Sequence, residues 1–235
     1  MTPPSPETDE LLRECNVNPS SPTFDGTTLY SATRQPQAIV RLRATDRIVL
    51  AQSIRIEPNG TLFIDGGKGT FVLGAYRFEV PAGARLCLHN VVLRDGTLGA
   101  MLVDGGSARV SHSTIVGNSN SGDGGGFLIT NAGTAIVATS NIWNNSAPSG
   151  SGGAFAVFAA SLQLLDCSLM FNNARRGGGL AMADDRSALI LLATKLAQNT
   201  AADSGGGLEV AGAARFTAPG VALAAELIRA LQAGN

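Results

Sequence analysis

Residues that could form a catalytic acid pair are rare in this chain. The only adjacent aspartates are Asp184 and Asp185, in the segment AMADDRSAL. Glycoside hydrolysis uses two carboxyl groups, one to protonate the leaving oxygen and one to activate water or attack the sugar. The residues 27 positions before and after this pair, one repeat away, are Val157-Phe158 and Ala211-Gly212, so no partner acid recurs there. We therefore predict a solvated turn and keep Asp184 and Asp185 only as weak catalytic candidates.

Metal and phosphate chemistry are also poorly represented. A calcium-assisted lyase needs several carboxylates and a basic residue on one face. Asp123 and Asp203 each precede a Gly-Gly pair, but the intervening repeats carry serines or arginines there. His89 and His112 have no Cys or carboxylate at ligand spacing, and the glycine runs lack the Lys-Ser/Thr of a phosphate loop. The sequence predicts no metal site and no cofactor.

Composition narrows the class of partner and leaves the compartment open. The 235 residues have a formal net charge of −1, and only 15% are charged. Without a basic patch, a nucleic-acid partner is not expected. Residues 1–14 hold no apolar signal core, and no run of 18 apolar residues could span a membrane. Such a chain is intracellular or part of a longer secreted protein, and its three isolated cysteines favour buried thiols, with one disulfide as the alternative.

A repeat of about 27 residues dominates the chain from Gly96 to Gly207. Gly-Gly pairs recur at intervals of 26 to 28 residues, and their last members are Gly126, Gly153, Gly179 and Gly207. An asparagine column keeps a similar step, at Asn118, Asn145, Asn173 and Asn199. Five residues before these asparagines lies a hydroxyl column, Ser113, Ser140, Ser168 and Thr194. Stacked coils would align the amides into a hydrogen-bonded ladder that satisfies polar groups at a buried corner.

Side-chain alternation after each Gly-Gly pair predicts an inner and an outer face. When the repeats are aligned on the last glycine, Ala100, Phe127, Ala154, Leu180 and Leu208 point inward. The outward positions then carry apolar residues on consecutive coils, Met101, Leu128 and Phe155, and a second column stands beside the asparagines, Val116, Trp143 and Phe171. Stripes of exposed apolar residues often mark a partner site. We predict that one of the two stripes is covered by the carboxy-terminal segment or by another molecule, with a partly exposed wall as the alternative.

The repeat predicts an all-β fold, a single-stranded right-handed parallel β-helix of about seven to eight coils. Strand-like segments broken by turns before residue 90 indicate three further, less similar coils. We assign residues 36–218 to the solenoid, 1–35 to an amino-terminal cap or leader, and 219–235 to a capping helix or tail. Short terminal helices would hide the open ends of the solenoid.

The repeat motifs resemble those of the chlamydial-type polymorphic outer-membrane proteins, in the pectate-lyase-like superfamily. The matching segments are GGFL, GGAF, GGLA and GGLE, with IVGN, IWNN, MFNN and LAQN. This resemblance covers roughly residues 90–212 and implies a surface scaffold or adhesin, at the cell surface or secreted. Unlike those proteins, this chain carries no signal sequence and no membrane barrel.

The sequence favours a non-catalytic repeat scaffold that binds protein or carbohydrate along its flat faces. A regular repeat without clustered acids, bases or metal ligands is the observation behind that prediction. The alternative is a polysaccharide lyase or glycoside hydrolase, which rests on analogy of fold alone.

Overall fold

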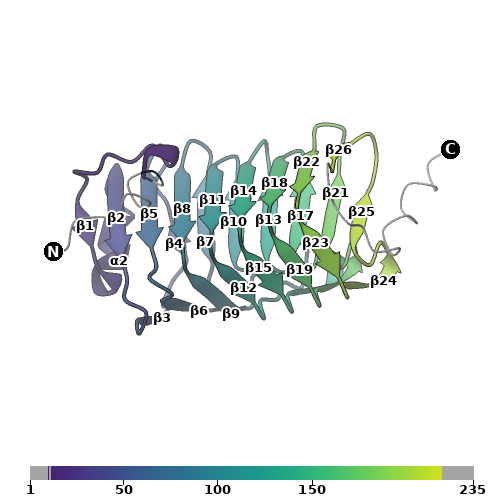
Figure 1. The fold of residues 1–235 in the computed structure, drawn as a ribbon, viewed down its shortest axis with the longest axis horizontal. Helices are drawn as coiled ribbons and strands as arrows, with labels where there is room; N and C mark the ends of the chain where they lie inside the picture. The colour runs from purple at the N-terminus through teal and green to yellow at the C-terminus, as the bar shows by residue number, and fades with distance from the viewer. Residues whose placement is uncertain (1–9, 11, 219–235) are drawn as a thin grey trace.

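The computed structural model describes residue 10 and residues 12–218 and shows an all-β solenoid of about seven turns (Figure 1). Every strand pair between neighbouring coils is parallel. The predicted parallel β-solenoid is therefore confirmed. The segments expected to form terminal helices at residues 5–12 and 219–235 lie largely or wholly outside the described residues.

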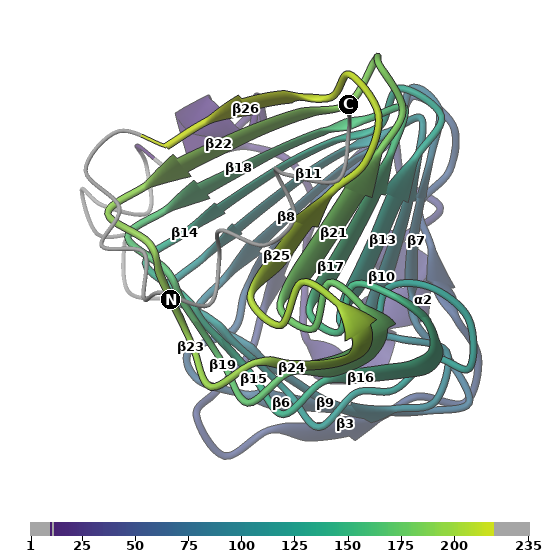
Figure 2. The same ribbon diagram turned by 90° about the vertical axis from the view of Figure 1, so that its right-hand side faces the viewer.

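Three sheets run along the solenoid, and each coil adds one strand to each (Figure 2). Sheet A has nine strands: β1 (Thr23–Phe24), β2 (Gln37–Arg41), β5 (Thr61–Asp65), β8 (Arg85–His89), β11 (Ser107–Ser111), β14 (Thr134–Ala138), β18 (Ser161–Leu165), β22 (Ala188–Leu192) and β26 (Arg215–Thr217). Sheet B has seven: β3 (Arg47–Val49), β6 (Thr70–Gly74), β9 (Val92–Gly96), β12 (Thr114–Val116), β15 (Asn141–Trp143), β19 (Ser168–Met170) and β23 (Lys195–Ala197). Sheet C also has seven: β4 (Ile54–Arg55), β7 (Phe78–Pro81), β10 (Met101–Asp104), β13 (Phe127–Thr130), β17 (Phe155–Phe158), β21 (Leu180–Ala183) and β25 (Leu208–Val210).

The length of a coil changes along the chain. Register partners in sheet A are 24, 24 and 22 residues apart from β2 to β11, and 27 apart in each later coil. The longer coils between β14 and β26 have room for a small fourth sheet, β16 (Ser146–Ser151), β20 (Asn173–Arg176) and β24 (Thr200–Ser204). This shorter period explains why the first three coils do not match the repeat in sequence, although their existence is confirmed.

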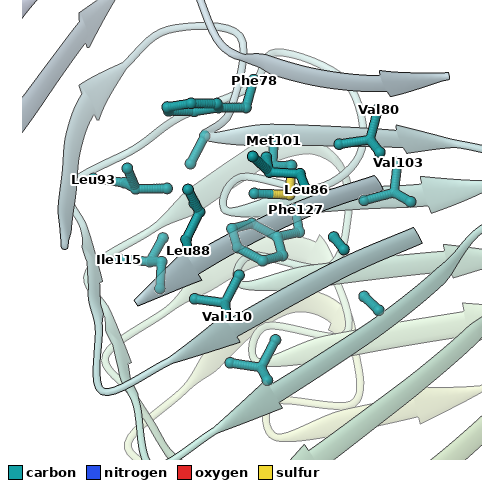
Figure 3. Packing of buried hydrophobic residues seen from close by; sticks show 14 of the residues in the cluster. Phe78, Val80, Leu86, Leu88, Leu93, Met101, Val103, Val110, Ile115 and Phe127 are labelled. Carbon is teal, nitrogen blue, oxygen red and sulfur yellow. The ribbon is translucent and has the colours of Figure 1, made fainter. Parts of the chain in front are cut away.

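Inward side chains of the three sheets fill the solenoid with one continuous apolar core (Figure 3). Phe127 and Phe155 lie on neighbouring coils with ring centroids 5.2 Å apart and nearly perpendicular planes. Such edge-to-face pairs add roughly 0.5–1.5 kcal/mol to the area that they bury. The core therefore stacks coil upon coil in a fixed register.

The prediction of an outward stripe at Met101, Leu128 and Phe155 is wrong for two of its three residues. Met101 and Phe155 are register partners of Phe127, and both are buried in the core. Leu128 alone is outward and half-buried. The error came from aligning the last glycine of each pair, because Ala100 and Ala154 take the place of that glycine in their coils.

The glycine column that does recur lies two residues earlier. Its members, Gly124, Gly152, Gly177 and Gly205, all have φ between +57° and +73°. A Cβ at any of them would lie 2.6 Å or less from a carbonyl oxygen of its own coil. At these positions both the backbone conformation and the close approach require glycine.

The amino-terminal end of the solenoid is closed by a short helical segment. A 3₁₀ turn, η1 (Gly26–Thr28), leads into α2 (Leu29–Ala32), which buries Leu29 and Ala32 against the core. The Tyr30 hydroxyl accepts hydrogen bonds from the backbone N–H of Ala51 and Gln52. This segment covers core side chains that the first coil would otherwise expose.

A disulfide joins Cys15 to Cys87 and fixes the preceding segment on the outer face of sheet A. Leu12, Cys15 and Val17 pack there against Ile39, Phe63 and Cys87 in a separate apolar cluster. The favoured prediction of plain thiols is thus wrong for these two cysteines, whose separation of 72 residues gives no sequence signal. Cys167 is the free cysteine; burial raises the pKa of its thiol to about 11.

We expect thiol counting to distinguish these states. The folded protein should not react with a thiol reagent at pH 8, because the buried Cys167 stays protonated. Unfolding without reductant should release one thiol per chain, and unfolding with reductant three. Three thiols without reductant would contradict the disulfide.

Replacing Cys15 and Cys87 together by serine should lower the free energy of unfolding by about 4 kcal/mol, because the 72-residue loop is no longer closed in the unfolded chain. Urea unfolding measures this loss. Adding reductant should reproduce it in the parent protein and change nothing further in the variant.

Candidate binding face at the asparagine corner

A ladder of four buried asparagines stands at the corner after sheet B. Its members are Asn118, Asn145, Asn172 and Asn199, each at most 4% exposed. Each side-chain nitrogen donates to the amide oxygen of the next asparagine at 3.0 Å. The same oxygen also accepts from the backbone N–H of the preceding asparagine, at 3.0–3.1 Å.

The remaining amide proton of each asparagine reaches back to the coil before it. Asn145 donates to the carbonyl of Ile115, and Asn172 donates to that of Ile142, both at 3.0 Å. In the shorter coil upstream, the backbone N–H of Gly96 donates to the Asn118 oxygen at 2.9 Å. Each internal amide thus connects three coils and leaves none of its own polar atoms unsatisfied.

The predicted ladder is correct at Asn118, Asn145 and Asn199, and wrong at Asn173. Asn173 is exposed, and its side chain donates to the Thr200 hydroxyl. The segment Leu169-Met170-Phe171-Asn172 matches Ile142-Trp143-Asn144-Asn145, whereas the prediction began one residue later. Two adjacent asparagines made both alignments readable, but only Asn172 keeps an unbroken interval of 27 residues.

The same slip moved the hydroxyl column in that coil. Cys167, and not Ser168, occupies the position of Ser140 and Thr194, and the Thr194 hydroxyl accepts from its backbone N–H. The thiol of Cys167 donates to carbonyls of Val137 and Leu165, as the hydroxyls do in neighbouring coils. A free buried cysteine therefore has a structural place in the repeat.

The residue before each ladder asparagine adopts a left-handed backbone conformation. These residues are Gly117, Asn144, Phe171 and Gln198, with φ between +54° and +65°. Glycine and asparagine adopt this conformation readily, but a bulky aromatic residue rarely does. Phe171 is also 49% exposed, so core burial does not compensate for this unfavourable position. Backbone strain of this kind is a recognised mark of functional sites.

Phe171 lies beside an exposed tryptophan on the outer face of sheet B. Trp143, 43% exposed, is the register partner of Val116 and Met170 on the neighbouring coils. A parallel polar row runs next to it, formed by Thr114, Asn141 and Ser168. A shallow depression of about 240 Å³ is lined by Thr114, Asn141, Trp143, Ser168, Met170 and Phe171. We call this depression the Trp143 face; none of its lining residues is charged.

The second predicted stripe is therefore brought together, with one change of register. Trp143 and Phe171 line the depression, while Val116 is half-buried one coil away in the same column. Met170 takes the column position that was predicted for Phe171. Whether another molecule covers this face remains a prediction.

Asp184 and Asp185 lie in a turn after β21. Asp184 accepts a hydrogen bond from the backbone N–H of Arg186 and forms an ion pair with its guanidinium group. The hydrogen bonds from Arg186 lower the pKa of Asp184 to about 2. A carboxyl group that stays ionised above that pH cannot serve as a general acid at neutral pH.

The other acids and histidines are also engaged in local contacts. The Asp123 carboxylate accepts from the Ser151 backbone, and Asp203 pairs with Arg175. The rings of His89 and His112 lie 5.1 Å apart, and His89 contacts the Ser111 hydroxyl. Within the described residues, no three His, Cys, Asp or Glu side chains cluster closely enough to hold a metal ion. In the same part of the chain, no helix has the length and apolarity to cross a membrane.

Comparison with known proteins gives no relative for this chain. No family model, curated protein or solved structure matches it. The solenoid and the Trp143 face therefore carry the functional argument alone.

Substitution of adjacent asparagines should separate the ladder from its neighbour. Asn172→Ala should lower the free energy of unfolding by about 3 kcal/mol, because it leaves buried backbone and amide partners on three coils without hydrogen bonds. Asn173→Ala, on the exposed side chain next to it, should change stability by less than about 0.5 kcal/mol. Equal losses in urea unfolding would contradict the ladder.

Proposed function

We propose that the protein is a non-catalytic repeat scaffold that binds a protein or a carbohydrate through the Trp143 face. The observation that carries this proposal is the exposure of Trp143 and Phe171 around one uncharged depression. Aromatic side chains contribute strongly to binding when a partner buries them. Phe171 occupies a backbone position that the rest of the ladder gives to Gly, Asn or Gln.

The chemistry of the face suits a neutral, amphipathic partner. Trp143 and Phe171 offer apolar ring surface, while Thr114, Asn141 and Ser168 offer hydroxyl and amide groups beside it. A sugar ring presents both an apolar face and hydroxyl groups, and so does a protein strand rich in Ser and Thr. A cell-surface or secreted adhesin, as the motif resemblance implies, would use such a face for attachment.

A polysaccharide lyase or glycoside hydrolase is the alternative. It is supported only by the common use of parallel β-helices for such enzymes, which is an argument from fold. The local engagement of Asp184, Asp123 and Asp203 in turns and ion pairs argues against it. Incubation with polygalacturonate, alginate and neutral polysaccharides, with and without Ca²⁺, would establish it if unsaturated or reducing ends appeared.

Trp143 is the only tryptophan in the chain, so its fluorescence reports directly on this face. We expect a saturable blue shift of its emission on titration with a panel of soluble oligosaccharides and purified surface proteins. Retention on surfaces coated with the panel member that binds should fall at least about tenfold in the double variant Trp143→Ala/Phe171→Ala, because two exposed aromatic contacts are lost.

The matched control is Ile190→Ala/Leu192→Ala, which removes two exposed apolar side chains from sheet A. This variant should retain the parent affinity. Equal loss of retention in both double variants, or undiminished retention in the Trp143/Phe171 variant, would overturn the proposal.

A further inference from the structure

A pocket lined by three arginines opens at the amino-terminal end of the solenoid, away from the Trp143 face. Its volume is about 430 Å³. Arg41 is the last residue of β2, Arg47 is the first residue of β3, and Arg43 lies in the corner between these strands. Residues 25–27, which begin the terminal helical segment, form the opposite wall.

The position of this pocket follows from the end of the stack. β3 is the terminal strand of sheet B, so no further strand pairs with its outer edge. In place of another coil, the loop at Asp25 and Gly26 packs over Ile48. A corner that later coils fill by stacking is thus left hollow in the first one.

The three guanidinium groups differ from other arginines in having no carboxylate partner. Within the described residues, arginines at six other positions hold a carboxylate oxygen within 3.4 Å. Arg41, Arg43 and Arg47 form no such pair and no side-chain hydrogen bond there. Three like charges around one pocket repel one another, and a bound anion would relieve this repulsion.

Two carboxylates line the same pocket, and both bind groups of their own loops. One Asp25 oxygen accepts hydrogen bonds from the backbone and hydroxyl groups of Thr27 and Thr28, at 2.6–3.2 Å. Asp46 accepts from the backbone N–H of Arg43 at 2.9 Å. Three guanidinium groups against two carboxylates leave a formal excess of one positive charge at the pocket.

We propose that this pocket is a binding site for an oxyanion, the carboxylate, sulfate or phosphate group of an acidic ligand, held by Arg41, Arg43 and Arg47. The planar guanidinium fork matches the paired oxygens of all three groups and binds them through two parallel hydrogen bonds. The site shares no residue with the Trp143 face, so each can fail without the other.

The test uses the full chain with three probes, inorganic phosphate, sulfate and citrate, followed by calorimetry and thermal unfolding at low ionic strength. We expect at least one probe to bind and to raise the melting temperature, and the order of the three affinities identifies the preferred anion. In Arg41→Gln/Arg43→Gln/Arg47→Gln, the affinity for that probe should fall at least about tenfold. Circular dichroism checks that the variant keeps its β structure.

The control is Arg13→Gln/Arg176→Gln/Arg215→Gln, which removes the same total charge from exposed positions elsewhere. This control should bind the probe within about twofold of the parent affinity, since long-range attraction alone is weak in salt. Failure of all three probes to bind the parent, or equal weakening in both triple variants, would overturn the site.

Discussion

The buried amide at the corner after sheet B is the constraint on which the later coils depend. A polar side chain in this apolar interior is tolerated only when its oxygen and both amide protons are bonded. Asn145 and Asn172 meet that condition only when the coils on both sides stand in one register. Apolar packing alone would accept a coil shifted along the strand by two residues, because alternation repeats at that interval. The ladder does not accept the shift, and it therefore fixes the coil length at 27 residues wherever it is present.

The same corner determines what the outer surface displays. An asparagine that turns inward must follow a residue in left-handed conformation, and that residue points away from the core. Small or polar residues fill this position at Gly117, Asn144 and Gln198, as the backbone favours. Phe171 departs from the pattern next to Trp143, and the two departures coincide on one depression. A cost in backbone energy that is not repaid by burial suggests selection for the surface itself.

Much of this architecture could be predicted from the sequence, because the repeat states it several times. The all-β parallel solenoid, the three dissimilar early coils and three of the four ladder positions follow from spacing and alternation. The errors share a cause, since a column was anchored on a residue that neighbours can imitate. Asn173 imitated Asn172, and Gly153 imitated the position that Ala154 fills. Sequence alone could not reveal the Cys15–Cys87 disulfide or the arginine pocket, because both join segments that no repeat relates.

A repeat that is uniform along its length offers every ligand the same surface many times, so specific recognition must come from departures from uniformity. In this solenoid the departures are of two kinds. Trp143 and Phe171 are aromatic substitutions inside the regular array, where the neighbouring positions hold Val116, Ala197 and Gln198. The unpaired arginines instead occupy the first corner, where stacking stops and a hollow remains. Because the regular coils between them are rigidly registered, both sites are held at fixed positions on one scaffold, and a long ligand could engage them together.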